Sequence, residues 1–274
     1  MVDILRREMA PIVDEAWQEI ELQSSRLLKG NLSGRKLVDF RGPHGWSFAA
    51  VNLGRLEVGA EDAATGVAWG LHKVLPLVEI RVPFTLKVWE LDDVARGAKN
   101  PDLRPMIEAA RKVAVFEETA LYRGFGGASI QGMLEVSSHA PVPLSSDRSK
   151  LTESVELALL AIQEAEIGGP FALVLGTEPY KWLMAGEPSA YPLRERIKAL
   201  VTGGIHWSPV LDGGAVLSRR GGDFEMTVGQ DVAIGYKMHT AREVELYFTE
   251  SFTFRVLDPA AAVELKLKAA ARSK

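Results

Sequence analysis

The chain has 274 residues, of which 47% are hydrophobic and 25% charged, and its formal net charge is -4. This balance is typical of a globular protein with one large domain or two modest ones, and it lacks the basic excess that would favour nucleic acid or an anionic membrane. The absence of cysteine excludes disulfides, thiolate metal sites and cysteine nucleophiles. The first ten residues lack the apolar core of a signal peptide and the apolar runs are too short to span a bilayer, so we expect a soluble cytoplasmic protein.

The first ninety residues predict a helix, a short strand, an extended stretch and a long strand. Their ranges, in that order, are 14–29, 36–40, 46–58 and 78–88. Residues 59–70 are small, acidic and rich in glycine and alanine, which is typical of a long loop or arm. In the long strand every second residue is apolar, which predicts one buried face. Pro83 cannot donate to a β-ladder, so we expect a bulge or a sheet edge there.

The rest of the chain alternates helices with strands. We expect helices at 102–123, 151–166, 177–184 and 192–201, and strands at 171–175, 205–211, 215–218, 224–228 and 244–256. The turn at residues 220–223 predicts a hairpin between its flanking strands, and the residues from 265 onward predict a frayed tail. The result is an α+β chain with two long alternating strands, whose length suggests pairing between subunits.

Two acidic residues fall on otherwise apolar faces. Glu117 lies on the stripe of the helix at 102–123, and Glu250 interrupts the apolar face of the last long strand. For Glu117, a buried carboxylate needs a partner. A helix edge or a subunit contact supplies such a partner more often than catalysis does.

A search for catalytic chemistry finds no motif. No two of the five histidines lie within helical reach of each other, so a metal site or a histidine relay would have to be assembled by the fold. The glycine-rich segments 30–36, 45–49 and 124–129 have the wrong spacing or context for a phosphate loop, a nucleophile elbow or a dinucleotide loop. We therefore predict no catalytic residue, no metal site and no enzyme activity. Trp89 ends the long strand on its less apolar face, where an indole could stack on a subunit or a planar ligand.

Four segments resemble a known family of shell proteins. They are GRKLVDFRGPHGW at 34–46, ELDDVARG at 90–97, RGGDFEMTVGQDVAIGY at 220–236 and ESFTFRV at 250–256. In this order, and without large gaps, they resemble the encapsulins, the linocin-like shell proteins, and the third segment is the most specific. The resemblance implies the tailed-phage major capsid protein fold, an α+β fold with a peripheral domain, an axial domain and an extended arm.

The resemblance also implies a division of the chain. It assigns 1–51 to the N-terminal helix and the start of the peripheral domain, 52–73 to the arm, 74–151 to the peripheral domain, 152–217 to the axial domain, and 218–274 to a return to the peripheral domain with a C-terminal tail. The sequence pattern by itself changes at about residue 150, which agrees with this division.

For function, the resemblance implies a cage and its contents. The cage would be icosahedral, built from a multiple of sixty copies of the chain held by large contacts. The contents would be cargo enzymes with a C-terminal targeting peptide, either ferritin-like iron-storage proteins or dye-decolourising peroxidases, and thus linked to iron storage and oxidative stress. Arg35 and Asp39 match positions that line the peptide groove, with Leu28 and Leu32 as its apolar floor. The alternative for Arg35 and Asp39 is a structural ion pair.

Two further sites rest on the resemblance. A five-fold pore loop would contain Glu187, Pro188, Ser189, Ala190 and Tyr191. Five copies of Glu187 would form a ring that attracts cations. Trp89 matches a tryptophan that stacks on a flavin, FMN or riboflavin, in some members of the family.

Two alternatives remain at this stage. The chain could be a prophage-type capsid protein that packages DNA, or a flavin-binding shell with a redox role. The mildly acidic composition, together with the lack of a recognisable scaffolding segment, disfavours the first alternative. We therefore expect neither a nucleic-acid partner nor a membrane partner.

Overall fold

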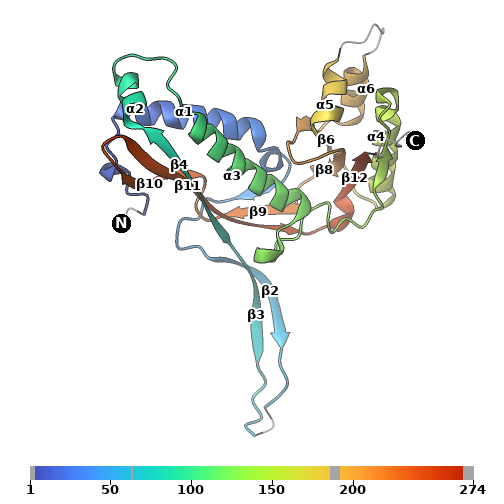
Figure 1. The fold of residues 1–274 in the computed structure, drawn as a ribbon. Coiled ribbons are helices and arrows are strands. Elements are labelled where there is room, and N and C mark those ends of the chain that lie inside the picture. The colour runs from blue at the N-terminus through green and yellow to red at the C-terminus, as the bar shows by residue number, and fades with distance from the viewer. Residues whose placement is uncertain (1–3, 63, 186–191, 268–274) are drawn as a thin grey trace, which may run out of the picture.

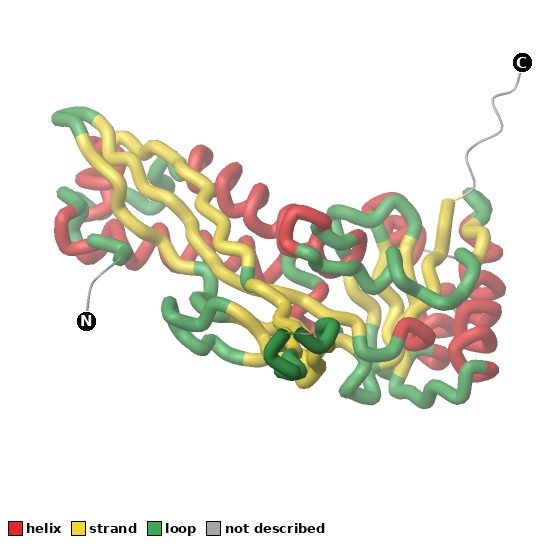
Figure 2. Tube along the Cα trace, turned by 90° about the horizontal axis from the view of Figure 1, so that it is seen from below, coloured by secondary structure: helices red, strands yellow, loops and turns green. Residues whose placement is uncertain are grey.

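The computed structural model describes residues 4–62, 64–185 and 192–267. Its first sheet contains β1 (Asp39–Arg41), β9 (Phe224–Val228), β11 (Glu243–Val256) and β10 (Ala233–His239), with β4 (Val78–Lys87) on the other edge of β11. The helices α1 (Asp14–Asn31) and α3 (Arg104–Arg123) cover one face of this sheet (Figure 1), and Figure 2 looks at the opposite face with the helices behind it. Apolar residues of α1, α3, β4 and β11 make one continuous core between the layers.

The two long alternating strands pair with each other. β4 and β11 are antiparallel over ten residue pairs, from Val78 opposite Phe252 to Lys87 opposite Glu243. The predicted pairing between subunits is therefore wrong for this edge of β11, because the partner lies in the same chain. Pro83 of β4 lies opposite Tyr247 of β11. Among the described residues β4 is an edge strand, which suits a proline because proline has no N–H to donate to a further strand.

A second sheet forms the other end of the body. Its strand order is β5 (Val142–Leu144), β12 (Ala262–Leu267), β8 (Gly214–Ser218), β6 (Phe171–Leu175) and β7 (Ile205–Trp207). The helices α4 (Leu151–Glu164), α5 (Thr177–Met184) and α6 (Leu193–Leu200) pack around it (Figure 1). Because β6 and β8 are buried on both faces, their residues read as apolar runs rather than alternation.

Two predictions about this end of the chain are wrong. The turn at 220–223 makes no hairpin, because β8 belongs to the second sheet and β9 to the first. Gly221 and Gly222 both have positive φ, and an ion pair between Arg220 and Asp223 holds the crossover between the sheets. Residues 265–267 are not a frayed tail, since they continue β12, which also means that this part of 218–274 lies in the second sheet.

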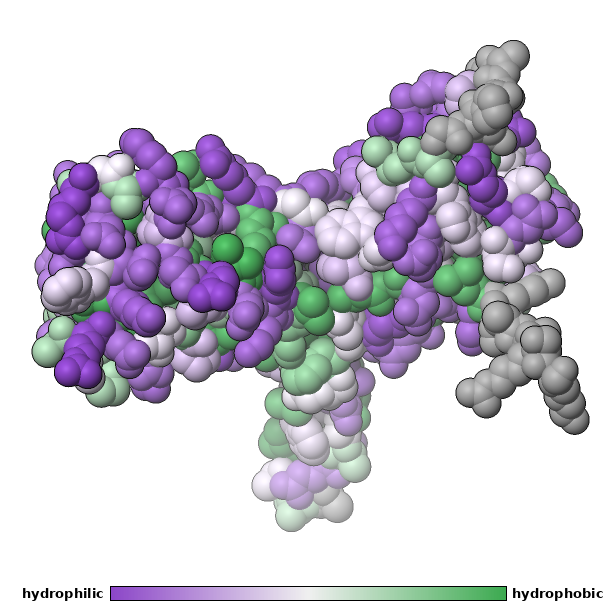
Figure 3. Space-filling model, turned by 45° about the horizontal axis from the view of Figure 1, so that its top comes forward, coloured by the Kyte–Doolittle hydropathy of each residue, from purple (hydrophilic) through white to green (hydrophobic). Residues whose placement is uncertain are grey.

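A two-stranded arm projects from the body. It consists of β2 (Ala50–Val58) and β3 (Gly70–Pro76), and it extends away from both sheets (Figure 1). Its apolar side chains are largely exposed, including Val58 at 76%, Leu71 at 66% and Trp69 at 56%. Hydrophobic side chains are accordingly visible along the arm in Figure 3. An isolated two-stranded ribbon is marginal in water, so this arm has the composition of an element that is covered by a partner.

Smaller differences concern the ends of elements. The strand expected at 36–40 is a 3₁₀ turn, η2 (Gly34–Lys36), followed by β1. The helix α2 (Val88–Ala95) was not predicted, and Trp89 lies in its first turn rather than at the end of β4. The remaining short turns are η1 (Arg7–Met9), η3 (Gly126–Ala128), η4 (Arg148–Lys150) and η5 (Pro259–Ala261). None of the described helices is both long and apolar enough to cross a membrane.

Candidate functional site

A groove runs between α1 and the first sheet. Its volume is about 460 Å³. The apolar residues that line it are Leu28, Leu32, Val232, Ala233, Ile234 and Phe248, and the charged residues around them are Arg7, Glu21, Lys29, Arg35, Lys36 and Asp231. An apolar floor with a charged rim suits an amphipathic segment of another protein.

The turn after α1 brings Arg35 to this groove. The N–H of Leu32 closes the helix on the carbonyl of Leu28, and η2 then reverses the chain. Gly34 packs against α3 so closely that a Cβ there would lie 2.5 Å from a methyl carbon of Leu121. Only glycine therefore allows the turn to approach α3 in this way.

Arg35 is the centre of an ion cluster below the groove. Its Nε and Nη2 donate to the Glu117 carboxylate at 2.7 to 3.0 Å, and its Nη1 donates to Asp231 at 2.7 Å. Nη2 also contacts a carboxylate oxygen of Glu250. The Arg35 side chain is 18% exposed, and those of Glu117 and Glu250 are fully buried. The two acids that interrupt apolar faces in the sequence thus share one guanidinium.

The pKa values in this cluster shift because of burial and charge. Burial works to lower the pKa of Arg35, but hydrogen bonds and charge from Glu117, with the charges of Glu250 and Asp231, outweigh it and raise the pKa. Burial, followed by the charge of Glu117, raises the pKa of Glu250 well above its ordinary value. Burial therefore favours the protonated form of Glu250, and the positive charge of Arg35 opposes this shift.

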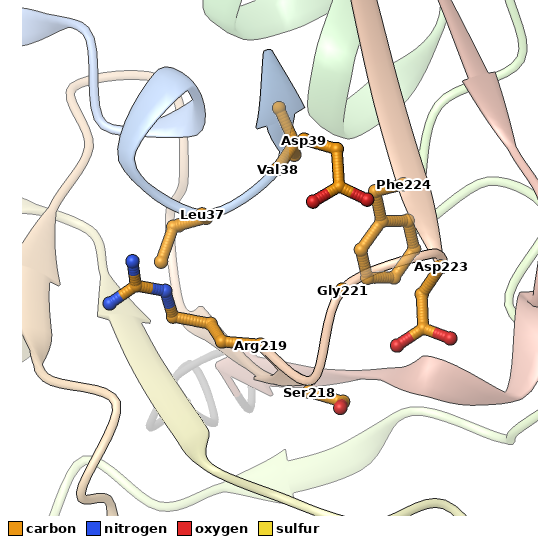
Figure 4. A pocket seen from close by; sticks show the side chains of 8 residues that line it. All are labelled: Leu37, Val38, Asp39, Ser218, Arg219, Gly221, Asp223 and Phe224. Carbon is orange, nitrogen blue, oxygen red and sulfur yellow. The ribbon is translucent and has the colours of Figure 1, made fainter.

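Asp39 does not belong to the groove. It lines a separate cavity of about 80 Å³ at the crossover between the sheets, where Figure 4 shows its carboxylate beside Gly221 and across from Arg219. The N–H of Gly222 donates to this carboxylate at 2.6 Å. Of the four residues predicted to bind cargo, Leu28, Leu32 and Arg35 are therefore together, and Asp39 is elsewhere. The alternative of a structural ion pair is confirmed for Arg35. Its partners are Glu117, Asp231 and Glu250, not Asp39.

Sequence reasoning missed the half of the groove that β10 contributes. Val232, Ala233 and Ile234 lie within the segment 220–236, which carried the family resemblance but no assigned role. Glu117 and Glu250 did give a signal, since both interrupt apolar faces and Glu117 was expected to need a partner, although at a helix edge or a subunit contact. That partner could not be named, because Arg35 is 82 residues from Glu117 and 215 from Glu250.

The other predicted sites have different outcomes. Trp89 is 74% exposed on α2, and its carbonyl accepts a hydrogen bond from Arg96 at 3.5 Å. The pore residues Glu187, Pro188, Ser189, Ala190 and Tyr191 lie outside the described residues. In the described ranges, no group of three or more histidine, aspartate or glutamate side chains is placed to hold a metal ion.

Comparison with known proteins gives matches over almost the whole chain. A family model described as "Encapsulating protein for peroxidase" matches residues 2–253. A type 1 encapsulin shell protein of Rhodospirillum rubrum is 43% identical over 96% of each chain. Among solved structures, a virus-like particle from Pyrococcus furiosus superposes with a TM-score of 0.63 at 22% identity, over 92% of this chain and 99% of that one. The capsid of the myovirus XM1 gives 0.52 at 11% identity, over 86% and 91%, which is a likeness of fold.

Proposed function

The chain belongs to the encapsulin shell-protein family, and from this we propose that it is the shell subunit of a nanocompartment that assembles into an icosahedral cage around cargo enzymes. The observation that carries the proposal is the match to a shell protein over 96% of both chains. The shell is a structural protein, and its chemistry belongs to the enclosed enzyme. We place the cage in the cytoplasm.

The arm supports assembly from many copies. Its exposed apolar residues, such as Leu56, Leu71 and Trp69, need cover that the chain itself does not provide in its described part. Obligate contacts in closed assemblies bury about 2,000 Å² or more each, and exchanged arms are a common way to reach such areas. We propose a multiple of sixty copies, with the first sheet as the peripheral part and the second as the axial part.

The groove beside α1 supports cargo capture. Leu28 and Leu32 offer an apolar floor, and the ion cluster fixes the position of Arg35 and Asp231 at its edge. We propose that a C-terminal targeting peptide of a peroxidase or a ferritin-like iron-storage protein docks here. Many identical grooves on one wall would hold an oligomeric cargo by avidity.

Two measurements test this function. Negative-stain imaging of the purified chain should give closed particles of uniform size, and monomers or dimers would overturn the proposal. For the groove, Ser25→Trp fills it from α1, while Leu22→Trp adds the same indole at an exposed position of the same helix. Both variants should assemble, and only Ser25→Trp should lose co-expressed cargo. If the two variants load equal amounts of cargo, the cargo does not bind in this groove.

The exposed indole of Trp89 favours a second, smaller role. We propose that a flavin stacks on this face of α2, since a 74% exposed tryptophan offers a large planar surface. Titration of purified shells with FMN and riboflavin should quench tryptophan fluorescence in the wild type and not in Trp89→Ala. Colourless shells with no quenching would end this proposal.

A further inference from the structure

The groove beside α1 has charges of different kinds at its two ends. At the end near the start of the chain, Arg7 pairs with Glu21 at 2.6 Å, so these charges cancel. At the other end Lys29 and Lys36 line the groove, and among the described residues neither makes an ion pair. A peptide that lies in the groove therefore meets a net positive charge at one end.

A second cavity adjoins the groove at this basic end. Its volume is about 350 Å³, and Lys36 lines both spaces. The cavity lies where α1 ends and where β7 and α5 of the second sheet approach, with Lys181, Tyr180 and Trp207 among its walls. Trp207 Nε1 donates to Thr177 Oγ1 at 3.2 Å, which fixes the indole as a wall. Sites at the junction of two structural units are where ligands commonly bind.

The wall of this cavity also includes His206. His206 Nε2 is buried and has no hydrogen-bond partner in the described part of the chain. Burial lowers the pKa of His206, and the charges of Arg219 and Lys36 lower it further, although a hydrogen bond with the Gly203 backbone opposes both. The neutral ring therefore adds no charge to that of the lysines at this cavity.

From this arrangement we propose that the C-terminal carboxylate of the cargo peptide binds in the second cavity, between Lys36 and Lys181. The inference rests on the proposed function, because a peptide from the end of a chain necessarily carries this carboxylate. It fixes the direction of the peptide, whose earlier residues cross the apolar floor towards Arg7 and Glu21. The last side chain would pack on Tyr180 and Trp207.

Two contacts in the unbound chain bear on this binding. Lys36 Nζ donates to the Lys29 carbonyl at 2.8 Å, which leaves its other N–H groups for a carboxylate. Lys181 Nζ is 2.6 Å from Glu178, and both side chains are about two-thirds exposed. Such an exposed pair is weak, so a carboxylate with a second ammonium at Lys36 can displace it. Glu178→Gln should therefore increase the affinity for the peptide, which is opposite to the effect of losing a structural contact.

The test compares two forms of one peptide on assembled shells. The probe is a synthetic peptide with the last twenty or so residues of the cargo that co-purifies with the shell, as the free acid and as the C-terminal amide. Two exposed ion pairs predict that the free acid binds about three- to tenfold more tightly at low salt. In Lys36→Gln/Lys181→Gln shells this difference should vanish, whereas Lys198→Gln, which removes a similar exposed lysine from α6, should retain it.

The outcomes separate the inference from the proposed function. If both peptide forms bind equally to the wild type, the position of the carboxylate is wrong and the groove assignment stands. If neither form binds, or if Ser25→Trp leaves binding unchanged, the groove assignment fails and the inference fails with it. If the free acid binds more tightly and this preference survives the double lysine variant, the carboxylate lies elsewhere.

Discussion

Glu117 and Glu118 are neighbours on α3 and both are fully buried, yet they are stabilised by different means. Glu117 faces a guanidinium, with three Arg35 hydrogen bonds between 2.7 and 3.0 Å. Glu118 has only neutral donors: Ser33 Oγ at 2.5 Å, Gly34 N at 2.7 Å and Ser208 Oγ at 2.7 Å. A positive charge therefore stabilises the Glu117 carboxylate, whereas only neutral hydrogen-bond donors stabilise that of Glu118.

This difference separates two tasks. The Glu117 side joins α3 to β11 and to the groove through Arg35. The Glu118 side joins α3 to the turn after α1 and to Ser208, which follows β7 in the second sheet, so this carboxyl links the two ends of the body. A charge that is balanced by an opposite charge stays ionised, whereas a buried charge that only dipoles balance is more easily protonated. The Glu118 contact therefore depends on pH.

The largest expected effect is the loss of the guanidinium. Arg35→Met retains an unbranched apolar stem but leaves Glu117 and Glu250 buried without their cation. Removal of one partner from a buried ion pair costs about 3 to 5 kcal/mol. We expect the free energy of unfolding in urea to fall by this amount.

A matched control is Arg41→Met. Arg41 is 63% exposed and pairs with Glu225 at 3.3 Å, so its loss should cost less than about 1 kcal/mol. Equal losses in the two variants would contradict the cluster. This result also bears on cargo loading, because a charge reversal at Arg35 would disturb folding as well as the groove.

The next effect is a dependence of stability on pH. Burial is the main cause that raises the pKa of Glu118 from 4.5 to about 7, against the hydrogen bonds from Ser33, Gly34 and Ser208. Since the folded chain holds this proton more tightly than the unfolded chain, its contribution is complete below pH 4.5 and is lost as the pH rises through 7. The shift corresponds to about 3 kcal/mol.

Comparison with a variant that cannot titrate isolates this contribution. The difference in unfolding free energy between the wild type and Glu118→Gln should change by about 3 kcal/mol between pH 4.5 and pH 8, because the other titrating groups cancel. As the pH rises over this range, the wild type should lose stability relative to Glu118→Gln. If the unfolding free energies of the two proteins change with pH in parallel, Glu118 keeps one protonation state throughout this range.

The same pair of residues shows what sequence can predict. Alternation predicted β4 and β11, and the stripe of α3 predicted that Glu117 would be buried with a partner. Glu118 gave no such signal, because its partners Ser33 and Ser208 are 85 and 90 residues away and are ordinary serines. Local patterns report which face is buried, but they do not report which distant polar group meets it.

The errors have the same physical origin. The segment 220–223 contains the glycines of a tight turn whether the next strand joins the same sheet or another, so the hairpin prediction could not distinguish the two. Arg35 and Asp39 are four residues apart, and a continuous strand would have put both on one face. The 3₁₀ turn at Gly34–Lys36 changes the direction of the chain, so they line different cavities.

A smaller effect is expected from the link to the second sheet. Ser208→Ala removes one of the donors to Glu118, which should cost about 1 to 2 kcal/mol in the free energy of unfolding. Because that donor lowers the pKa of Glu118, its loss should also move the pH-dependent decrease to a higher pH. Ser149→Ala, which removes an exposed hydroxyl beside Asp147, should change stability by less than about 0.5 kcal/mol and leave the decrease caused by Glu118 at the same pH.

The smallest effect tests the protonation state on the other side of α3. Burial and the charge of Glu117 raise the pKa of Glu250 well above its ordinary value, which favours the protonated form. Glu250→Gln then removes no charge: the amide oxygen can still accept from Arg35, and the amide nitrogen takes the place of Oε2, which has no partner in the described part of the chain. We expect a change of less than about 1 kcal/mol in the free energy of unfolding, far below that of Arg35→Met. A loss as large as that of Arg35→Met would mean that Glu250 is ionised, and Arg35 would then be balanced by three charges rather than two.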